Sequence, residues 1–586
     1  MTDPAAPKPY FLGPRSENQD WLRERLGAAM DDWLAWRRSL FADDPAAVTD
    51  ADAAAPAFLA RRAALDAALG ELGAKLRGEL PTYSPRYIGH MVSETALPAL
   101  LGHFAALLHN PNNTSREASR VGTALEAEAI AMLAQMVGFD PAQAHGHFTS
   151  GGTVANLEAV WRARFRLDHR LALALTLAET EGRPLDPFAD AQMSPAAAAA
   201  LAARHGVDDL AMRSRSSVLG NPFQMAERLS EASGRPWRGP VILAPGHKHY
   251  SWIKAANVFG LGEEAFWSVP LDGEGRLSVQ GLGARIEAAR EQGRPVLAVV
   301  SVAGTTELGE IDPVDAVADH LDALRAEGVD IWHHVDAAYG GFFCALDPDE
   351  PLLGAAQRRA LRAIGRAETV TIDPHKLGYA PYACGALLTR DAASDTVSAF
   401  VAPYVERAEL GEAPWTRTLE GSRAATGAAA TWLTGRALGF GPAGMGAVLS
   451  ATLDSCRAIR SAVTAAIPEI RPLDPTDTNI FCFSVAAQGE ALSVANARTA
   501  AVHARVAASP GFSMSRTVLG REACGELIDR HVAAWGGRRD ADRLVLVRCV
   551  VMNPFWAEPA VRARLLPELT AELAAIVAAT EDQAAA

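Results

Sequence analysis

Short, nearly continuous runs of apolar residues recur through the middle of the chain, and a polar or glycine-rich turn follows each of them. The clearest runs lie at 240–245, 295–303, 329–336 and 369–372. Stretches with the three- to four-residue periodicity of helices separate them. Apolar strands that alternate with helices indicate a parallel sheet with both faces covered. We therefore predict an α/β protein with a large, mostly parallel sheet of about seven strands and helices on both faces.

Different patterns flank this region. From about residue 18 to residue 80, apolar residues such as Trp21, Leu22 and Leu26 recur at helical spacing. This pattern predicts helices whose apolar stripe faces either the core or a dimer partner. After about residue 438, helical stretches alternate with strand-like runs, which predicts a small α+β domain. The expected division is a helical segment at 1–110, a large domain at 111–425 and a C-terminal domain at 426–586.

Composition narrows the class of protein. The 586 residues are enough for two or three domains, and 49% hydrophobic against 21% charged residues indicates a globular chain. A formal charge of −14 argues against nucleic acid or an anionic membrane as partner. Six cysteines without a CxxC pair predict neither disulfides nor a metal site. Since we find no signal peptide and no membrane span, we expect a cytoplasmic protein.

One lysine stands at the end of an apolar run. Lys376 follows Asp373, Pro374 and His375, and Pro374 ends the strand because it lacks a backbone donor. Loops at strand ends carry the ligands of open α/β sheets. An amine held in a polar pocket beside His375 suits Schiff-base chemistry with an aldehyde cofactor. The alternative is a solvated surface lysine, which is the usual state of this residue type.

A second strand end supports the cofactor hypothesis. Asp336 closes the run at 329–336 and is followed by small residues. An aspartate at the end of a buried strand can hold a protonated pyridine nitrogen, and Ala338 leaves room for a flat ring. Asp336 and Lys376 together predict pyridoxal phosphate as the cofactor.

Three sequence segments support this hypothesis further by occurring together and in this order. They are TSGGTVAN at 149–156, HVDAAYGG at 334–341 and DPHK at 373–376. Through them the chain resembles the group II pyridoxal-phosphate decarboxylases, the family of glutamate, aromatic and tyrosine decarboxylases. The resemblance spans roughly residues 83 to 556. It implies a fold-type I enzyme that decarboxylates an L-amino acid to an amine and CO₂. It also implies a homodimer with shared active sites.

The phosphate of the cofactor is expected at the first of these segments. Gly151 and Gly152 allow backbone amides to approach closely, and the run from Val154 has a helical pattern. An anion at that helix N-terminus would be stabilised by free N–H groups and by the helix dipole. A Gly-Gly pair before a helix is more often only a turn, so the assignment of Ser150, Gly151, Gly152 and Thr153 depends on the resemblance.

The resemblance assigns further residues to the cofactor. His249 matches a histidine that lies on the cofactor ring, on the face opposite Ala338; without the resemblance, a structural histidine would be the default. Thr306 lies at a predicted strand end near Asp336, where it is either a hydrogen-bond partner of that carboxylate or an ordinary turn residue. His375 precedes the lysine and belongs to the same site.

Two residues match positions that reach the partner subunit. Ser422 matches a residue that touches the partner's phosphate, and Tyr404 matches a loop tyrosine that returns a proton to the substrate Cα. The alternative for Tyr404 is an ordinary surface tyrosine. Glu126 and Glu128, on a predicted amphipathic helix, are expected to be solvated.

Substrate recognition is predicted at Arg548, Tyr87, His90 and Asn110. Arg548 lies inside an apolar run, where an unpaired guanidinium is costly, so it needs an anionic partner. That partner is a structural carboxylate or, as the resemblance implies, the substrate α-carboxylate. Tyr87, His90 and Asn110 match the substrate entrance of the family, although turn chemistry explains Asn110 equally well.

The side chain of the substrate is the least determined property. The opening segment, SPRYIGHM and NPNN look closest to bacterial tyrosine decarboxylases, which favours an aromatic amino acid. An acidic amino acid stays open, because R-x-x-x-x-N-P at Arg548 matches the glutamate-decarboxylase branch. A different carbon–carbon lyase on the same fold and a non-catalytic scaffold are the remaining alternatives.

Overall fold

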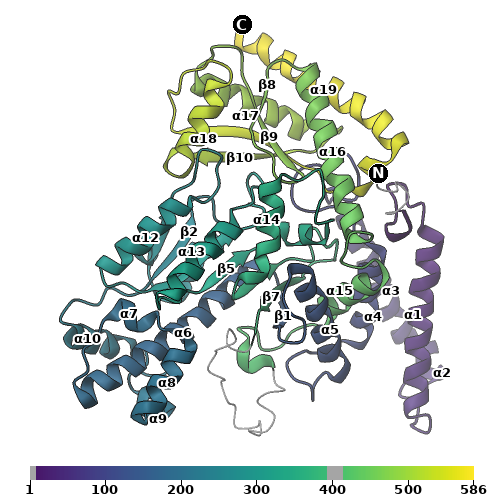
Figure 1. Cartoon of the computed structure of the whole chain (residues 1–586). Coiled ribbons are helices and arrows are strands. Elements are labelled where there is room, and N and C mark those ends of the chain that lie inside the picture. The colour runs from purple at the N-terminus through teal and green to yellow at the C-terminus, as the bar shows by residue number, and fades with distance from the viewer. Residues whose placement is uncertain (1–7, 392–413, 586) are drawn as a thin grey trace.

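The structure is a computed structural model, and it describes residues 8–391 and 414–585 (Figure 1). A seven-stranded sheet forms its centre, in the order β1-β7-β6-β5-β4-β2-β3. Strands β3, β2, β4, β5 and β6 pair in parallel, whereas β7 runs antiparallel to both of its neighbours. The strands are β1 (His145–Thr149), β2 (Val241–Pro245), β3 (Phe266–Val269), β4 (Val296–Val302), β5 (His333–Asp336), β6 (Thr369–Ile372) and β7 (Gly385–Thr389).

Helices cover both faces of this sheet, as the apolar strands require. On β2, Ile242 and Ala244 pack with α6 and α11, whereas Val241 and Leu243 pack with α12 and α13 on the opposite face. The predicted α/β class is therefore confirmed. The helices of this part are α5 (Arg120–Val137), α6 (Gly152–Glu181), α11 (Ser251–Val258), α12 (Val279–Glu291), α13 (Val314–Ala326) and α14 (Ala355–Ala363).

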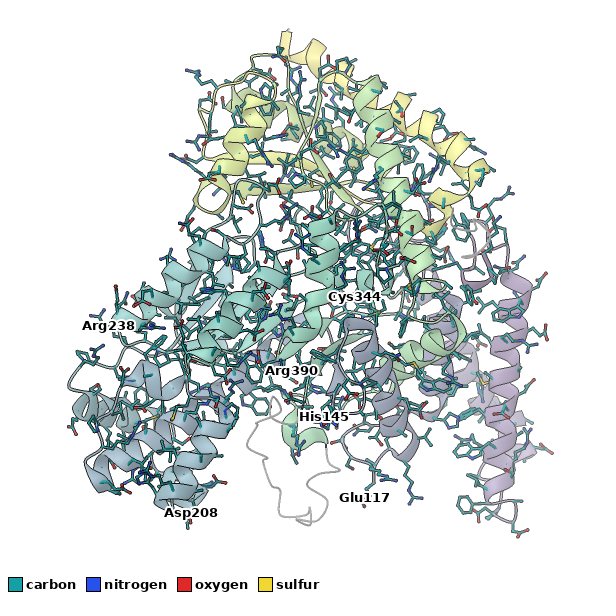
Figure 2. The ribbon with its side chains drawn as sticks, in the orientation of Figure 1. Glu117, His145, Asp208, Arg238, Cys344 and Arg390 are labelled. Atoms are coloured by element: carbon teal, nitrogen blue, oxygen red, sulfur yellow. The ribbon has the colours of Figure 1, made fainter. Side chains whose placement is uncertain are left out.

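Residues 187–233 contain a group of short helices at the outer end of α6 (Figure 1). Ser194 caps α8, because its hydroxyl oxygen accepts from the N–H of Ala197 at 3.1 Å. Figure 2 shows Asp208 and Arg238 at the periphery of the molecule in this region, far from Cys344. The helices are α7 (Pro187–Ala191), α8 (Pro195–His205), α9 (Asp209–Arg213) and α10 (Pro222–Ser233).

A second sheet lies at the C-terminal end of the chain. Its four strands follow the order β10-β11-β9-β8 and all pair antiparallel, which confirms the α+β prediction. The strands are β8 (Ile470–Pro472), β9 (Ile480–Val485), β10 (Ser515–Gly520) and β11 (Arg543–Val550). The helices are α16 (Met445–Ala466), α17 (Leu492–Ala508), α18 (Arg521–Ala533) and α19 (Pro559–Ala585).

The N-terminal segment is helical as predicted, but its first helices contribute nothing to the core. No residue of α1, α2 or α3 is buried, and the α3 leucines Leu65, Leu69 and Leu72 are each more than half exposed. The core-facing alternative is therefore wrong for α2 and α3, whereas Leu22 and Leu26 of the α1 stripe are half-buried where α1 packs on α4. They are α1 (Gln19–Leu40), α2 (Asp50–Ala54) and α3 (Pro56–Leu76), followed by α4 (Leu97–His109).

The helix α15 (Thr426–Ala437) packs on α4 and α5, so the chain enters the C-terminal sheet region only with α16. The division at 110 and 425 remains a prediction. Among the described helices, none is both long and apolar enough to span a membrane.

Candidate active site

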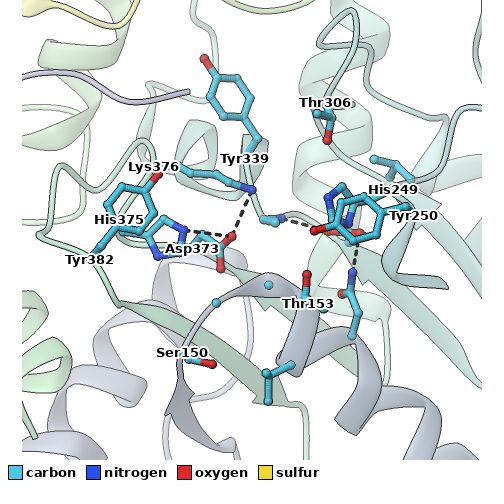
Figure 3. Close-up of a pocket in the computed structure, with 18 residues that line it drawn as sticks. Ser150, Thr153, His249, Tyr250, Thr306, Tyr339, Asp373, His375, Lys376 and Tyr382 are labelled. Carbon is cyan, nitrogen blue, oxygen red and sulfur yellow. Dashed lines mark hydrogen bonds and ion pairs between the residues drawn. The ribbon is translucent and has the colours of Figure 1, made fainter. Parts of the chain in front are cut away.

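A cavity of about 320 Å³ opens where β4, β5 and β6 end and α6 begins (Figure 3). This volume suits a small molecule, and the carboxyl ends of parallel strands are the usual ligand site of open α/β sheets. The structure brings together here ten of the residues that the sequence assigned to the cofactor: Ser150, Gly151, Gly152, Thr153, His249, Thr306, Asp336, Ala338, His375 and Lys376.

Asp336 is the last residue of β5, and its side chain is held by three donors. Its Oδ2 accepts from Asn156 Nδ2 at 2.8 Å and from Trp252 Nε1 at 3.1 Å, and its Oδ1 accepts from the N–H of Ala338 at 3.3 Å. These bonds fix the orientation of a carboxylate that is only 5% exposed. The predicted bond from Thr306 is wrong: Thr306 lines the cavity without donating to Asp336.

A chain of hydrogen bonds links Asp336 to His249. Asn156 Nδ2 also donates to Ser251 Oγ at 3.0 Å, and this hydroxyl lies 2.9 Å from His249 Nδ1. The backbone N–H of Ser251 donates to the same Nδ1 at 3.3 Å. Because a backbone N–H can only donate, Nδ1 is the acceptor and the ring proton is on Nε2. Burial lowers the pKa of His249, which keeps its ring neutral.

Lys376 forms an ion pair with a carboxylate that the sequence analysis did not assign to the site. Its Nζ lies 3.0 Å from Asp373 Oδ2, and His375 Nε2 lies 3.5 Å from the same oxygen. Burial favours the neutral amine, but the nearby carboxylates, Asp373 foremost and then Asp336, together outweigh burial and raise the pKa of Lys376. Lys376 and Asp373 lie side by side in Figure 3, so the amine is anchored at the cavity wall.

The N-terminus of α6 forms the end of the cavity where a phosphate was predicted. No side chain caps this helix, so its first N–H groups face the cavity end. A Cβ atom on Gly152 would lie 2.9 Å from Asp373 Oδ2, and one on Gly385 would lie 2.5 Å from the Cα of Gly151. Only glycines allow this close approach. The N–H of Ser150 already donates to a carboxylate, Glu420 Oε2, at 3.2 Å.

Arg548, His90 and Tyr87 form a cluster beside this cavity. Arg548 Nη2 lies 3.2 Å from His90 Nδ1, and the N–H of His90 donates to Tyr87 Oη at 3.3 Å. Arg548 Nη1 donates to the carbonyl of Thr306 at 2.8 Å, which ties the cluster to the cavity wall. The carboxylate of Glu307 is 4.0 Å away, and Arg548 Nε has no partner in the described part of the chain. The guanidinium therefore retains capacity for an anion.

Two of the remaining predicted residues, Asn110 and Ser422, do not line the cavity of their own chain. Asn110 is an exposed residue that ends α4 in the left-handed conformation, with φ of 47°, as the turn alternative predicted. Ser422 is exposed and accepts from Asn112 Nδ2 at 3.0 Å. Tyr404 lies outside the described residues, so its role stays a prediction.

Glu126 corrects an expectation. It is buried rather than solvated, accepts from the N–H of Phe148 at 2.7 Å and pairs with the buried Arg423. Arg423 in turn donates to the carbonyl of Asn113 at 2.9 Å. The ion pair and its hydrogen bonds join α5, β1 and the residues just before α15. They hold β1, the strand that leads to the predicted phosphate-binding end of the cavity.

The comparisons with known proteins decide the family. Residues 217–485 match the pyridoxal-dependent decarboxylase conserved domain. The chain is 31% identical to an L-tyrosine decarboxylase of Levilactobacillus brevis over 478 residues, which are 76% of this chain and 73% of the relative. The chain belongs to the pyridoxal-dependent decarboxylases. A second relative of this decarboxylase, an L-tyrosine decarboxylase of Enterococcus faecium, is 29% identical over 94% of this chain and 95% of its own.

Solved structures agree on the fold of the decarboxylase. The crystal structure of Oryza sativa TDC with PLP and tryptamine matches with a TM-score of 0.62 at 18% identity, over 95% of this chain and 98% of that one.

The cofactor is pyridoxal phosphate, and the residues of this cavity fit it. The uncapped N-terminus of α6 suits the phosphate. The carboxylate of Asp336 suits the ring nitrogen, and the amine of Lys376 suits the aldehyde carbon.

Sequence reasoning missed three residues that support this site. Asn156 and Trp252 hold Asp336, and Asp373 holds Lys376. Asn156 and Asp373 lie inside the segments TSGGTVAN and DPHK, so their polar side chains close to predicted site residues could have identified them. The sequence around Trp252 contains no such signal, because a tryptophan in a helix has the pattern of a core residue.

Proposed function

We propose that this decarboxylase converts an aromatic, tyrosine-like L-amino acid to its amine and CO₂. The cavity carries the chemical part of the proposal: Lys376 and Asp336 reach it from the ends of adjacent parallel strands. Full-length similarity to L-tyrosine decarboxylases supports the aromatic side chain. Tyrosine residues at the cavity, including Tyr339 and Tyr382, agree with an aromatic substrate.

Pyridoxal phosphate supplies an electron sink for the electrons of the broken Cα–carboxylate bond. The chain's residues bind and orient the reactants. Lys376 Nζ would hold the aldehyde carbon of the cofactor, and the Asp373 carboxylate would balance the charge of the lysine when it is a free ammonium. Asp336 would hold a proton at the ring nitrogen, and the neutral ring of His249 would lie beside the cofactor. Arg548 binds the substrate carboxylate with its unused donor.

A screen of substrates tests the proposal. Purified protein with pyridoxal phosphate is incubated with tyrosine, phenylalanine, tryptophan, glutamate, aspartate and 2,4-diaminobutyrate, and each amine is quantified by mass spectrometry. We expect tyramine to form with the highest kcat/KM. A preference for glutamate or aspartate would overturn the aromatic assignment but leave the decarboxylase chemistry in place.

We further propose that two chains form a cytoplasmic homodimer with shared active sites. The exposed leucines of α3 give an apolar surface that a second copy would cover, and Ser422 is exposed as a residue that reaches a partner must be. Light scattering of the purified protein checks the mass. A monomer at micromolar concentration would contradict the proposal.

Replacing Glu420 by Gln is expected to tighten the binding of pyridoxal phosphate roughly three- to tenfold. The half-buried Glu420 carboxylate accepts from the N–H of Ser150, so a phosphate at this end of the cavity meets a like charge and a competitor. Fluorescence titration of the apoenzyme gives the Kd. Pyridoxal, which lacks the phosphate, should bind both proteins equally, and Glu291→Gln on exposed surface is the matched control. Weaker binding of pyridoxal phosphate to Glu420→Gln would contradict this role.

The acid limb of the pH–rate profile should report His249. Because burial lowers the pKa of this ring from its ordinary 6.5, the neutral form persists to lower pH, and activity should fall only below pH 6.5. Protonation there would put a cation at Nδ1, where Ser251 donates. His249→Gln, which does not titrate, should lose this limb when kcat/KM is measured from pH 4.5 to 8. An unchanged limb in the variant would assign it to another group.

A further inference from the structure

A second cavity, of about 640 Å³, lies between α16 and the connection from β8 to β9. Arg457, Arg460 and Thr464 reach it from α16, at the three- and four-residue spacing that places them on one helix face. Thr476 and Thr478 line the opposite wall. Figure 1 shows β8 in the upper part of the molecule and β5 in its central part. None of the active-site residues lines this cavity.

Three hydroxyl groups of the residues that line this cavity lack a partner. The Oγ1 atoms of Thr464, Thr476 and Thr478 are buried and make no hydrogen bond within the described chain. Other helical threonines satisfy their hydroxyls locally: Thr434 and Thr499 donate to the carbonyl four residues earlier, at 2.8 and 2.7 Å. Thr464 does not, although its helix offers the same carbonyl. Buried hydroxyls without a partner are uncommon, and a polar ligand in the cavity would offer them one.

The cavity also carries an excess of positive charge. Arg457 donates to the carbonyl of Leu352, and no carboxylate lies within ion-pair distance of it in the parts of the chain that the structure describes. Arg460 pairs with Asp474 at 2.5 Å, and this aspartate is largely exposed. Among the described residues, one of the two guanidinium groups at this cavity therefore has a carboxylate partner and the other has none. The remaining donors favour an anion.

We propose that this cavity binds a small tetrahedral oxyanion, either inorganic phosphate or the phosphoryl group of a small molecule. The guanidinium groups of Arg457 and Arg460 match phosphate oxygens, and the hydroxyls of Thr464 and Thr476 donate from opposite walls. Donors that converge from several directions suit a tetrahedral anion better than a planar carboxylate.

The chain connects this cavity with the active site. Thr478 is followed by Asn479, whose Oδ1 accepts from Tyr339 Oη at 2.5 Å and whose Nδ2 donates to Thr452 Oγ1 of α16 at 3.1 Å. Tyr339 lines the cavity that holds Lys376. A ligand that orders α16 and the segment around Thr476 therefore acts on the residue that positions Tyr339. Any effect on the active site must be reciprocal.

Calorimetric titration of the holoenzyme with phosphate tests the proposal. The cofactor is first fixed by borohydride, so its own phosphate cannot exchange and no turnover is needed. We expect saturable binding of one phosphate per chain. Arg457→Gln and Thr464→Val should each weaken it at least tenfold, whereas Thr464→Ser, which keeps the hydroxyl, should bind as the parent does. Arg285→Gln, on an exposed part of α12, is the matched control.

Three results of the calorimetric titration would overturn the site. Absence of saturable heat at millimolar phosphate is the first, and equal affinity in Arg457→Gln and Thr464→Val is the second. The third is tighter binding of succinate than of phosphate, which would replace the tetrahedral anion by a carboxylate. Thermal unfolding without ligand verifies that the variants fold. If added phosphate raises the melting temperature without saturation and equally in all variants, the effect is general salt exclusion. That result also counts against the site. None of these results depends on which amino acid the enzyme decarboxylates.

Discussion

Lys376→Ala is expected to lower turnover by roughly 10³-fold or more and to prevent covalent attachment of the cofactor. The variant removes an amine that both holds the aldehyde carbon and moves protons, and acid–base catalysis alone contributes roughly 10²–10⁴-fold. It also leaves the buried Asp373 without its cation. Amine formation at saturating substrate and cofactor gives the rate. Absorbance above roughly 400 nm, where a conjugated Schiff base absorbs, reports covalent attachment of the cofactor.

Lys376→Arg separates the positive charge of the lysine from the chemistry of its amine. Arginine keeps a positive charge beside Asp373 but cannot hold the aldehyde carbon, since its guanidinium stays protonated. We expect this variant to fold as the parent does and to be as inactive as Lys376→Ala. Lys75→Ala, at an exposed position in α3, is the control for loss of a lysine. Turnover within tenfold of the parent in either Lys376 variant would contradict the assignment.

Asp336→Asn is expected to lower kcat roughly 10- to 100-fold while the protein keeps its fold and binds the cofactor. A charge-assisted hydrogen bond contributes about 1.5–3 kcal/mol, and an amide cannot hold the ring proton as an anion does. The structure adds a second cost. Both Asp336 oxygens accept from Asn156, Trp252 or the N–H of Ala338. An asparagine at this position would replace one accepting oxygen by an NH₂ group, which would face these donors without a partner.

The measurements for Asp336→Asn are kcat, the cofactor Kd and the melting temperature. Asp315→Asn, on the more exposed side of α13, is the matched control and should change none of them. A kcat within twofold of the parent would show that the ring nitrogen does not need an anion. Loss of cofactor binding with an unchanged kcat per bound cofactor would reduce Asp336 to a binding residue.

The parallel strands could be predicted from the sequence because buried strands consist mainly of apolar residues. Every residue of β2, β4, β5 and β6 is buried, and β2 and β4 are nearly continuous apolar runs. β5, HHVD, was predicted from the apolar residues that precede it, whereas β1, HGHFT, was missed because no apolar run precedes it. The antiparallel direction of β7 was out of reach as well, since its apolar residues would fit either direction.

The site was predictable where one strand end carries the chemistry and unpredictable where distant segments meet. Asp336 and Lys376 each follow an apolar run. The contact between Asn156 and Asp336 joins residues 180 positions apart, and the one between Glu126 and Arg423 joins residues 297 apart. Glu126 had the pattern of a solvated charge because its partner lies on another element. Local periodicity cannot carry such information.

The most direct test of the account is to locate the cofactor on the chain. Protein purified with pyridoxal phosphate is reduced with borohydride, digested and mapped by mass spectrometry. The account predicts a single phosphopyridoxyl group, on Lys376, in the peptide that contains the DPHK segment. The same label on another lysine, such as Lys254 at the neighbouring helix α11, or no label on a protein that still forms amine, would contradict it.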